Sequence, residues 1–372
     1  MYMNDEKKRL LLVTIQDNGN IGNRLQNYAL QTVRENMGAQ VDNLTVYHEL
    51  WELRQIQIKN KFKRLISFIY PNKYLANYCR TLRKEGCISF TLKYIHGIKY
   101  VKRDQVANID WTEYDCAVAG SDQIWHNWHR MDRELDFFYL SFMPEFKRVA
   151  YAPSFGFEAF PKEDVETHKK GLYGFNYLSC REQEGCELIQ SLSGRKAEKV
   201  LDPTLLLSVK EWEKLERRPL QMKRDHYVLC FFIGEITSSY KDEVKRICDK
   251  RGIDAFYFND LKDPYRYKIS PQEFIWLIHH ADTVCTDSFH ASVFSILFER
   301  RLRVFERVNH NSAHMFGRLR DLLNPLGLMK NVYGEEISGD METQLSDDAF
   351  QYLKKAREDS INYLSRAINV LN

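Results

Sequence analysis

Residues 281–300 combine a short β-branched run, a polar turn and an apolar helical pattern that begins beside a histidine. Asp287 and Ser288 both favour the N-cap, where a side-chain oxygen accepts hydrogen bonds from the first helical N–H groups. The remaining N–H groups and the positive end of the helix dipole attract an anion. His290, at this helix start, titrates near neutral pH. The segment predicts an anion pocket with a proton-transfer group in its wall, the alternative being a histidine with a structural role only.

A second strand-to-loop junction with unusual side chains lies far upstream. A buried-type strand at 116–119 leads into Gly120, after which come three hydrogen-bonding residues and a large aromatic one: Ser121, Asp122, Gln123 and Trp125. Because the two junctions occur in separate halves of the chain, they indicate two domains that face a shared cleft.

A third polar loop, QDNGNIGNR at 16–24, follows the first expected strand. Gly19 and Gly22 permit a tight turn into a helix, so that the backbone can approach a phosphate or a sugar. The spacing lacks the GxGxxG pattern of dinucleotide-binding proteins. A ligand loop that presents Asn20 and Asn23, and a plain turn capped by asparagines, are both consistent with this segment.

Strand-like and helix-like patterns alternate along the chain, which is typical of α/β folds with parallel sheets. At 372 residues the chain exceeds the usual size of one hydrophobic core, so we expect two domains. Pro203 and Pro219 mark the connection between them. We predict domains at 1–207 and 208–335 and a helical segment at 336–372. Strands are expected at 10–15, 40–45, 116–119, 148–152, 177–180, 199–201, 227–233, 254–258, 283–286 and 302–305.

The C-terminal segment carries a helical pattern. Ser346 and the two aspartates after it favour a helix start. Apolar residues then recur at roughly helical spacing, namely Phe350, Leu353, Leu364, Ala367, Ile368 and Leu371. We expect this helix to pack back across the first domain.

Composition excludes several classes of protein. A hydrophobic content of 44% supports packed cores and argues against disorder. No run approaches the ~20 apolar residues that span a bilayer, and no secretory stretch follows the N-terminus, so we expect a cytoplasmic protein. Eight scattered cysteines without CxxC spacing indicate reduced, mostly buried thiols. His126 and His129 show no third ligand nearby, so we expect neither a metal nor another cofactor.

Positive charge is concentrated at 53–103, where thirteen basic residues stand against one acid. This stretch carries a net charge of +12, which leaves −9 for the rest of the chain. Aromatic and aliphatic residues alternate with the basic ones, so the stretch suits an anionic membrane surface. The alternative is amphipathic helices whose basic face is only solvated. Nucleic acid is not expected as a partner, because no recognition fold appears and the remainder is acidic.

Four motifs in order give the chain a family resemblance. They are DNGNIGN at 17–23, GSDQIW at 120–125, LDPTLL at 201–206 and TDSFHA at 286–291. Together they resemble the polysaccharide pyruvyl transferase family, over about residues 10–328, where GRLRDLL at 317–323 resembles the family's late Arg-containing helix. The resemblance implies two Rossmann-like domains in a GT-B-like arrangement, with the active site between them. It also implies transfer of pyruvate from phosphoenolpyruvate to a sugar, as a ketal, in surface-polysaccharide synthesis.

The residues suit that chemistry. Ketal formation needs a proton on the methylene carbon of the donor and a base for the sugar hydroxyl, and a histidine can serve either purpose. We therefore predict catalytic roles for His290 and Asp122. Predicted donor ligands are Arg181, Ser288, Asp287 and Arg318. Predicted contacts to a sugar acceptor are Asn20, Asn23, Ser121, Gln123 and Trp125. A lipid-linked acceptor at the inner face of the membrane is consistent with the basic stretch at 53–103.

Arginine should supply much of the charge that the donor needs, because its planar fork binds carboxylate and phosphate in a bidentate way. Arg181 matches the arginine that follows a strand in the family and binds the donor, although an ion pair with Glu182 or Glu184 would also explain it. Family members often have Arg-x-His where this chain has Ser288-Phe-His290. Arg318, Arg320 or Arg307 would have to replace that arginine.

Two other functions remain consistent with the sequence. A GT-B glycosyltransferase could hold the diphosphate of a nucleotide sugar at the same helix N-terminus. A non-catalytic homologue that binds sugar or lipid could have lost the donor arginine. Release of phosphate from phosphoenolpyruvate separates the first function from both of these.

Overall fold

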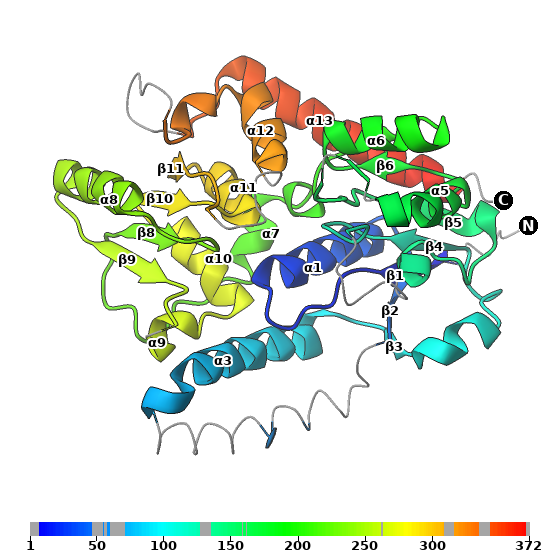
Figure 1. The fold of residues 1–372 in the computed structure, drawn as a ribbon, viewed down its shortest axis with the longest axis horizontal. Coiled ribbons are helices and arrows are strands. Elements are labelled where there is room, and N and C mark those ends of the chain that lie inside the picture. The colour runs from blue at the N-terminus through cyan, green and yellow to red at the C-terminus, as the bar shows by residue number, and fades with distance from the viewer. Residues whose placement is uncertain are drawn as a thin grey trace, which may run out of the picture.

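The computed structural model describes residues 7–46, 55, 58–59, 71–126, 135–157, 159–160, 162–261, 263–308, 316–334 and 343–369. Two parallel β-sheets form its centre, with helices packed around them (Figure 1). A further pair of parallel strands comprises β6 (Ser179–Cys180) and β7 (Glu198–Lys199). The predicted α/β class with parallel sheets is confirmed.

The first sheet contains strands from the N-terminal half. Its order is β3 (Ile98–Tyr100), β2 (Gln40–Thr45), β1 (Arg9–Val13), β4 (Cys116–Ala119) and β5 (Arg148–Ala150). Val13 at the end of β1 pairs with Ala119 at the end of β4. The loops that follow these two central strands therefore begin side by side, which brings the motifs at 17–23 and 120–125 to one edge.

The second sheet contains strands from the C-terminal half. Its order is β11 (Arg301–Val304), β10 (Thr283–Thr286), β8 (Val228–Phe231) and β9 (Ala255–Phe258). Thr286 at the end of β10 pairs with Phe231 of β8 on one side and with Val304 of β11 on the other. The loop that leads to His290 therefore lies between the loops after β8 and β11.

Helices connect the strands, and side-chain caps define several of their starts. Ser270 and Glu273 form a reciprocal capping box at the start of α10, and Thr237 caps α8. Within the described residues, no helix is long and apolar enough to cross a membrane. The α-helices are α1 (Ile21–Asn36), α3 (Pro71–Tyr94), α4 (Leu135–Phe138), α5 (Val165–Tyr173), α6 (Gln183–Ser193), α7 (Val209–Glu213), α8 (Ser238–Arg251), α9 (Pro264–Tyr267), α10 (Pro271–His279), α11 (Phe289–Leu297), α12 (Gly317–Leu323) and α13 (Asp347–Asn369). The 3-10 helices are η1 (Arg103–Asn108), η2 (Glu145–Lys147), η3 (Lys162–Asp164), η4 (Pro203–Leu205), η5 (Asn324–Leu326) and η6 (Met329–Asn331).

Each expected strand is present, although most are shorter than predicted. The sequence did not predict β3, because its three residues are only half-buried and carry no apolar run. The two halves share one apolar cluster that passes through Trp212, whose ring contacts Tyr28 of α1 and Phe294 of α11. Packing between the halves is therefore continuous at this point.

The C-terminal helix α13 packs back on the N-terminal half, as expected, and runs along the upper edge in Figure 1. Tyr363 donates a hydrogen bond to the carbonyl of Ala150 in β5, at 2.8 Å. The Ser360 hydroxyl accepts one from the Leu201 N–H, at 2.9 Å. Phe350 departs from the prediction because its side chain is 57% exposed.

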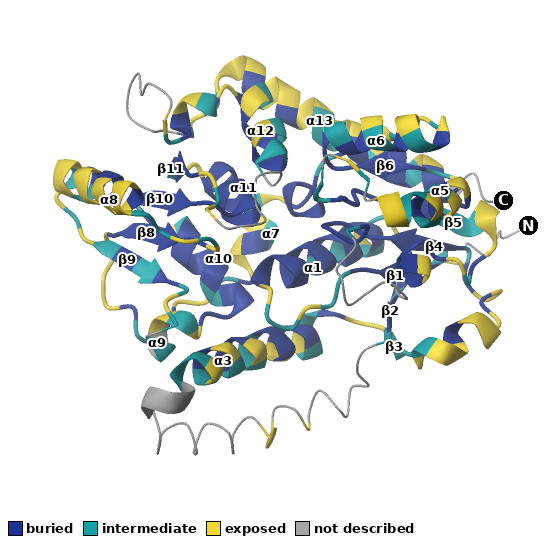
Figure 2. Ribbon diagram, viewed as in Figure 1, coloured by how far each residue is buried: buried dark blue, intermediate teal, exposed yellow. Residues whose placement is uncertain are grey.

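The basic stretch at 53–103 is described only in part, and residues 60–70, with Lys61, Lys63 and Arg64, lie outside the described residues. Helix α3 within this stretch packs against α1, α9 and α10. Buried and exposed residues alternate along α3 (Figure 2). Arg80, Lys84 and Lys93 are among its exposed residues. Amphipathic packing thus accounts for α3, and association with a membrane stays a prediction.

Candidate active site

A cavity of about 990 Å³ lies where the loops of the two sheets meet. Its walls come from the start of α1, the loop after β4, the ends of β8 and β9, and the start of α11. Helix α3 closes one side with Arg80 and Arg83. The predicted site residues on these walls are Asn20, Asp122, Gln123, Ser288, His290 and Arg318. The structure therefore brings residues from both halves of the chain to one cavity.

Ser288 positions His290 in the first turn of α11. Ser288 is the N-cap, and its hydroxyl accepts a hydrogen bond from the Ala291 N–H at 3.4 Å. The imidazole of His290 lies against the start of α1, where a Cβ atom on Gly22 would be only 2.3 Å from Nδ1. On its other side, Nε2 is 3.9 Å from Oδ2 of Asp202. The ring is thus clamped between an α1 glycine and a buried carboxylate.

Burial controls the charge of His290. It lowers the pKa of the imidazole below its ordinary value of 6.5, although Asp202 and Asp122 act in the opposite direction. The imidazole is therefore neutral at neutral pH. The Nε2 atom is buried and neither accepts nor donates a hydrogen bond in the described part of the structure. A neutral imidazole at a cavity wall is suited to accept a proton from a substrate hydroxyl.

Behind His290, Arg181 joins three buried carboxylates. Its guanidinium donates to Oδ2 of Asp202 at 2.8 Å and to Oδ1 of Asp122 at 3.2 Å, and Nε is 3.6 Å from Glu182. The Arg181 side chain is only 3% exposed and its guanidinium stacks on the Phe289 ring. Arg181 does not line the large cavity and instead lines a second one of about 270 Å³.

Asp122 occupies a special backbone position. Its φ angle is 69°, in the left-handed region that aspartate adopts at some cost. The Asp122 carbonyl accepts hydrogen bonds from Ile124 and Ser154, at 2.7 and 2.8 Å, which stabilise this turn. Its carboxylate accepts a hydrogen bond from the side-chain amide of Asn23. Burial opposes ionisation, but Arg181 and other nearby cationic groups hold the pKa of Asp122 below its usual value.

Asp202 is a site residue that motif reasoning did not select. It belongs to the LDPTLL segment at the start of η4, and it accepts hydrogen bonds from Ser121 and from both the N–H and hydroxyl of Thr204. Burial raises its pKa, yet His290, Arg181 and the Thr204 hydrogen bonds together lower it to about 2. The carboxylate is therefore ionised. Its proximity to His290 was not readable from the sequence, although the motif itself was.

Arg318, from α12, is the cation of this group that faces the large cavity. Its nearest carboxylate is Asp122, with 3.6 Å between Nη1 and Oδ1. Burial and the like charge of Arg181 lower the pKa of Arg318 to about 10, so it remains charged at neutral pH. Its Nε–H makes no hydrogen bond in the described structure. Arg318 is thus poorly neutralised and open to an anion.

Of the other arginines considered as replacements, Arg307 lines the cavity and Arg320 does not. Arg307 donates a hydrogen bond from Nη2 to the Asp287 carbonyl, at 3.3 Å, and its Nε is 3.6 Å from Oδ2 of the Asp287 carboxylate. Arg320 is exposed, with its guanidinium over the ring of Phe316. Arg307 and Arg318 therefore provide the fixed positive charge at the wall beside α11.

Several predicted residues lie behind the wall. Asp287 does not cap α11, because its two carboxylate oxygens accept hydrogen bonds from the Ile233 and Gly234 N–H groups, each at 2.7 Å. Trp125 is fully buried and stacks on Tyr139 within an aromatic cluster. Neither Asp287, predicted as a donor ligand, nor Trp125, predicted as an acceptor contact, lines the large cavity in this structure. Ser121 and Asn23 are also buried and support Asp202 and Asp122.

Comparison with known proteins identifies a family. The family model for polysaccharide pyruvyl transferases matches residues 20–307. No curated protein matches the chain at a significant level. Among solved structures, an uncharacterised protein from Klebsiella pneumoniae subsp. pneumoniae NTUH-K2044 is 10% identical over 83% of this chain and 87% of that one, with a TM-score of 0.37. The glycotransferase of kitacinnamycin is 10% identical over 98% and 96%, with a TM-score of 0.32.

The two structural similarities are too weak to carry an argument about activity. The family match is different, because it covers most of the chain and includes the loops that contribute Asp122, Asp202 and His290 to one site. On this evidence the chain belongs to the polysaccharide pyruvyl transferase family.

Proposed function

We propose that this protein transfers the pyruvyl group of phosphoenolpyruvate to two hydroxyls of a sugar in a surface polysaccharide, with release of phosphate. The observation that carries the proposal is that three features share one wall of the cavity. They are the neutral imidazole of His290, the guanidinium of Arg318, whose charge is poorly neutralised, and the N-terminus of α11. Such a wall combines an anion site with a proton acceptor. Family membership independently supports a polysaccharide-modifying transferase.

The donor binds between Arg318, Arg307 and the start of α11 in this proposal. Phosphoenolpyruvate carries a carboxylate and a phosphate, and two arginines with the free N–H groups of a helix start suit these anions. Arg181 then has a supporting role, because its charge is already matched by Asp122 and Asp202. Arg307 and Arg318 replace the arginine that is absent at Ser288.

His290 is the base for the acceptor hydroxyl. The imidazole of His290, which lines the cavity, can take the hydroxyl proton while the hydroxyl oxygen bonds to the central carbon of the donor. The methylene carbon gains one proton in this addition, which balances the proton that the hydroxyl loses. The C–O bond to phosphate then breaks, the second hydroxyl adds to the same carbon, and the released phosphate takes up its proton. Asp202 stabilises the imidazolium that forms, since its carboxylate is ionised and buried.

The acceptor occupies the part of the cavity beside α1. Asn20 and Gln123 line this part, and their amides can hydrogen-bond sugar hydroxyls. A volume of about 990 Å³ is near the upper end for small-molecule sites, so the cavity exceeds the needs of the donor alone. We further propose that the two sheets belong to two domains, divided near residue 207, in a GT-B-like arrangement. We also propose that the stretch at 53–103 binds an anionic membrane surface, where a lipid-linked acceptor would be located.

The test is phosphate release from phosphoenolpyruvate in the presence of candidate acceptor glycans. We expect release that depends on the acceptor, and a mass increase of the glycan that corresponds to a pyruvyl ketal. His290→Gln should keep the fold by circular dichroism but lose ~10²–10⁴-fold in rate, because glutamine forms hydrogen bonds without accepting the proton. The control is His226→Gln, on an exposed residue that does not line the cavity.

Other outcomes would exclude the proposal. Turnover of a nucleotide sugar without use of phosphoenolpyruvate would assign a glycosyltransferase. Binding of a glycan with no turnover of either donor would assign a binding protein. A rate for His290→Gln close to that of the wild type would remove His290 as the base.

A further inference from the structure

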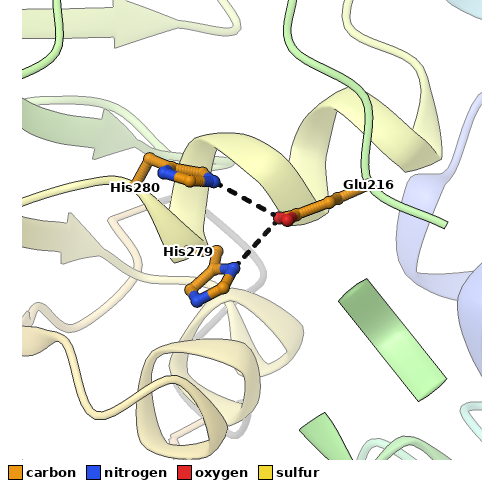
Figure 3. A group of neighbouring side chains, drawn as sticks. All are labelled: Glu216, His279 and His280. Atoms are coloured by element: carbon orange, nitrogen blue, oxygen red, sulfur yellow. Dashed lines mark hydrogen bonds and ion pairs between the residues drawn. The ribbon is translucent and has the colours of Figure 1, made fainter. Parts of the chain in front are cut away.

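Glu216, His279 and His280 form a cluster outside the walls of the large cavity (Figure 3). His279 and His280 come from the C-terminal end of α10, and Glu216 comes from the segment that follows α7. Nδ1 of His279 is 3.0 Å from Oε2 of Glu216, and Nε2 of His280 is 3.6 Å from the same oxygen. One atom from each residue lies within 4.8 Å of the others.

These distances match the spacing of ligands around zinc. Zn²⁺ binds histidine nitrogen at ~2.0–2.1 Å and carboxylate oxygen at ~2.0–2.2 Å, usually in a tetrahedron. Donor atoms at such distances lie ~3.3 Å apart in a tetrahedron. The two separations from Glu216 fall on either side of this value. The two imidazole nitrogens lie within 4.8 Å of each other, so they would have to approach each other more closely to bind one ion with Glu216.

Aromatic stacking holds both imidazoles in place. The His279 ring stacks on Phe298, with centroids 4.2 Å apart and planes 16° apart. The His280 ring stacks on Trp276 at 4.5 Å and 23°. Rings that are already oriented lose little rotational freedom when they bind an ion. The cluster is thus preorganised, unlike a pair of freely rotating surface histidines.

Two features of the cluster attract a cation. The C-terminal end of α10 carries the negative end of the helix dipole, and Glu216 adds a full negative charge. Arg300 lies near enough to His280 to act against a cation there. Because Arg300 repels a cation here, the Glu216 carboxylate is the charge on which binding depends most.

We propose that Glu216, His279 and His280 bind one zinc ion. Two imidazoles and one carboxylate are a donor set that suits Zn²⁺, with water in the fourth position because His280 is the more exposed ligand. The ion would join the segment after α7 to the end of α10 and so stabilise the connection between the halves. This proposal is independent of the reaction in the cavity. It departs from the sequence-based expectation that the protein binds no metal.

The experiment measures Zn²⁺ binding by the full chain after chelator treatment and dialysis. Titration calorimetry should give one Zn²⁺ per chain, and the midpoint of thermal unfolding should rise with Zn²⁺ but not with Mg²⁺, which prefers oxygen ligands. Glu216→Gln and His280→Gln should each weaken binding by more than ~100-fold, beyond the usual effect of changes outside the ligand set. His226→Gln is the matched histidine control, and Cys248→Ser tests the partly exposed thiol.

A wild-type chain that takes up no Zn²⁺ would show that the cluster is only a pair of histidine–glutamate contacts. Equal affinity in the wild type and in both ligand variants would place any bound ion elsewhere and overturn the proposal. If a variant fails to fold, Co²⁺ bound to the wild type identifies the ligands instead. Its visible spectrum should show tetrahedral nitrogen and oxygen ligands without thiolate bands. The two proposals can fail separately. Glu216→Gln should leave phosphate release intact, and a protein that does not use phosphoenolpyruvate should still bind Zn²⁺.

Discussion

Gly22 and His290 illustrate how closely the site depends on single atoms. A methyl group at residue 22 would overlap the imidazole, since its Cβ would lie 2.3 Å from Nδ1 and 2.8 Å from Cε1 of His290. We therefore expect Gly22→Ala to displace the ring and to reduce phosphate release as strongly as His290→Gln does. The measurement is a rate comparison of the two variants under the same conditions.

A double variant separates this steric effect from a general loss of stability. Removal of the imidazole in His290→Ala leaves space for the new methyl group. The cost of Gly22→Ala in unfolding free energy should then be much smaller than in the wild type, which is a coupling that a double-mutant cycle detects. Additive effects of the two substitutions would mean that Gly22 and His290 do not interact.

Arg318 and Arg181 should differ in what they contribute. Arg318 faces the cavity, so Arg318→Lys loses bidentate contacts to the donor and should raise the KM for phosphoenolpyruvate by ~10-fold or more. Arg181 pairs with buried Asp122 and Asp202, so removal of its charge in Arg181→Met should cost ~3–5 kcal/mol in unfolding free energy. Steady-state kinetics and urea unfolding of both variants check this. If Arg181→Lys stays folded and raises the KM for phosphoenolpyruvate, whereas Arg318→Lys does not, then Arg181 binds the donor, as the sequence predicted.

At the scale of elements, α3 matters because one of its arginines ties it to the second sheet. The buried Arg83 guanidinium donates to the Tyr267 carbonyl at 3.0 and 3.2 Å and to the Asn259 side chain at 2.5 Å. It also stacks over the Tyr267 ring. Part of the basic stretch is therefore a structural contact at the cavity, in addition to any surface role.

Arg83→Met should destabilise the fold by ~1–3 kcal/mol, because it leaves buried acceptors at residues 259 and 267 without their donor. Lys84→Met is the matched control, since Lys84 is an exposed neighbour on the same helix. Urea unfolding of the two variants gives the comparison. Equal stability of both would show that water replaces the guanidinium at little cost.

At the scale of the whole molecule, a buried histidine links stability to pH. His168 is fully buried among Phe155, Phe157 and Phe160, and Nδ1 is 2.5 Å from the Tyr139 hydroxyl. Burial, together with His126, lowers the pKa of His168 from 6.5 to about 4. The unfolded chain therefore takes up a proton at a higher pH than the folded protein. Stability is fully present above about pH 6.5 and is lost as pH falls toward about 4.

The size of this contribution is up to ~3 kcal/mol. His168→Gln does not titrate and can still bond to Tyr139, so it should flatten the fall in unfolding free energy between about pH 7 and about pH 5. Urea titrations of both proteins at these pH values provide the comparison. The same slope in the variant and in the wild type would assign the pH dependence to other groups.

The local sequence patterns predicted the other strands and the order in which they occur, but not β3. Buried apolar runs predicted the strands because parallel strands covered on both sides require them, and Ser288 was predicted as a cap because its hydroxyl acts on N–H groups of its own helix. These interactions span a few residues. The same reasoning placed His290 at a helix start and Asp122 directly after a strand.

Only the tertiary structure determined which of the predicted polar residues reach the cavity. The sequence shows that Arg181, Asp287 and Trp125 can bind a ligand, but it does not show that buried carboxylates, backbone N–H groups and aromatic rings already occupy them. Likewise, Asp202 lies near His290 because η4 and α11, which are far apart in the sequence, pack against each other. The physical reason is that burial and long-range pairing set the charge and availability of a side chain, and both arise only when distant segments pack.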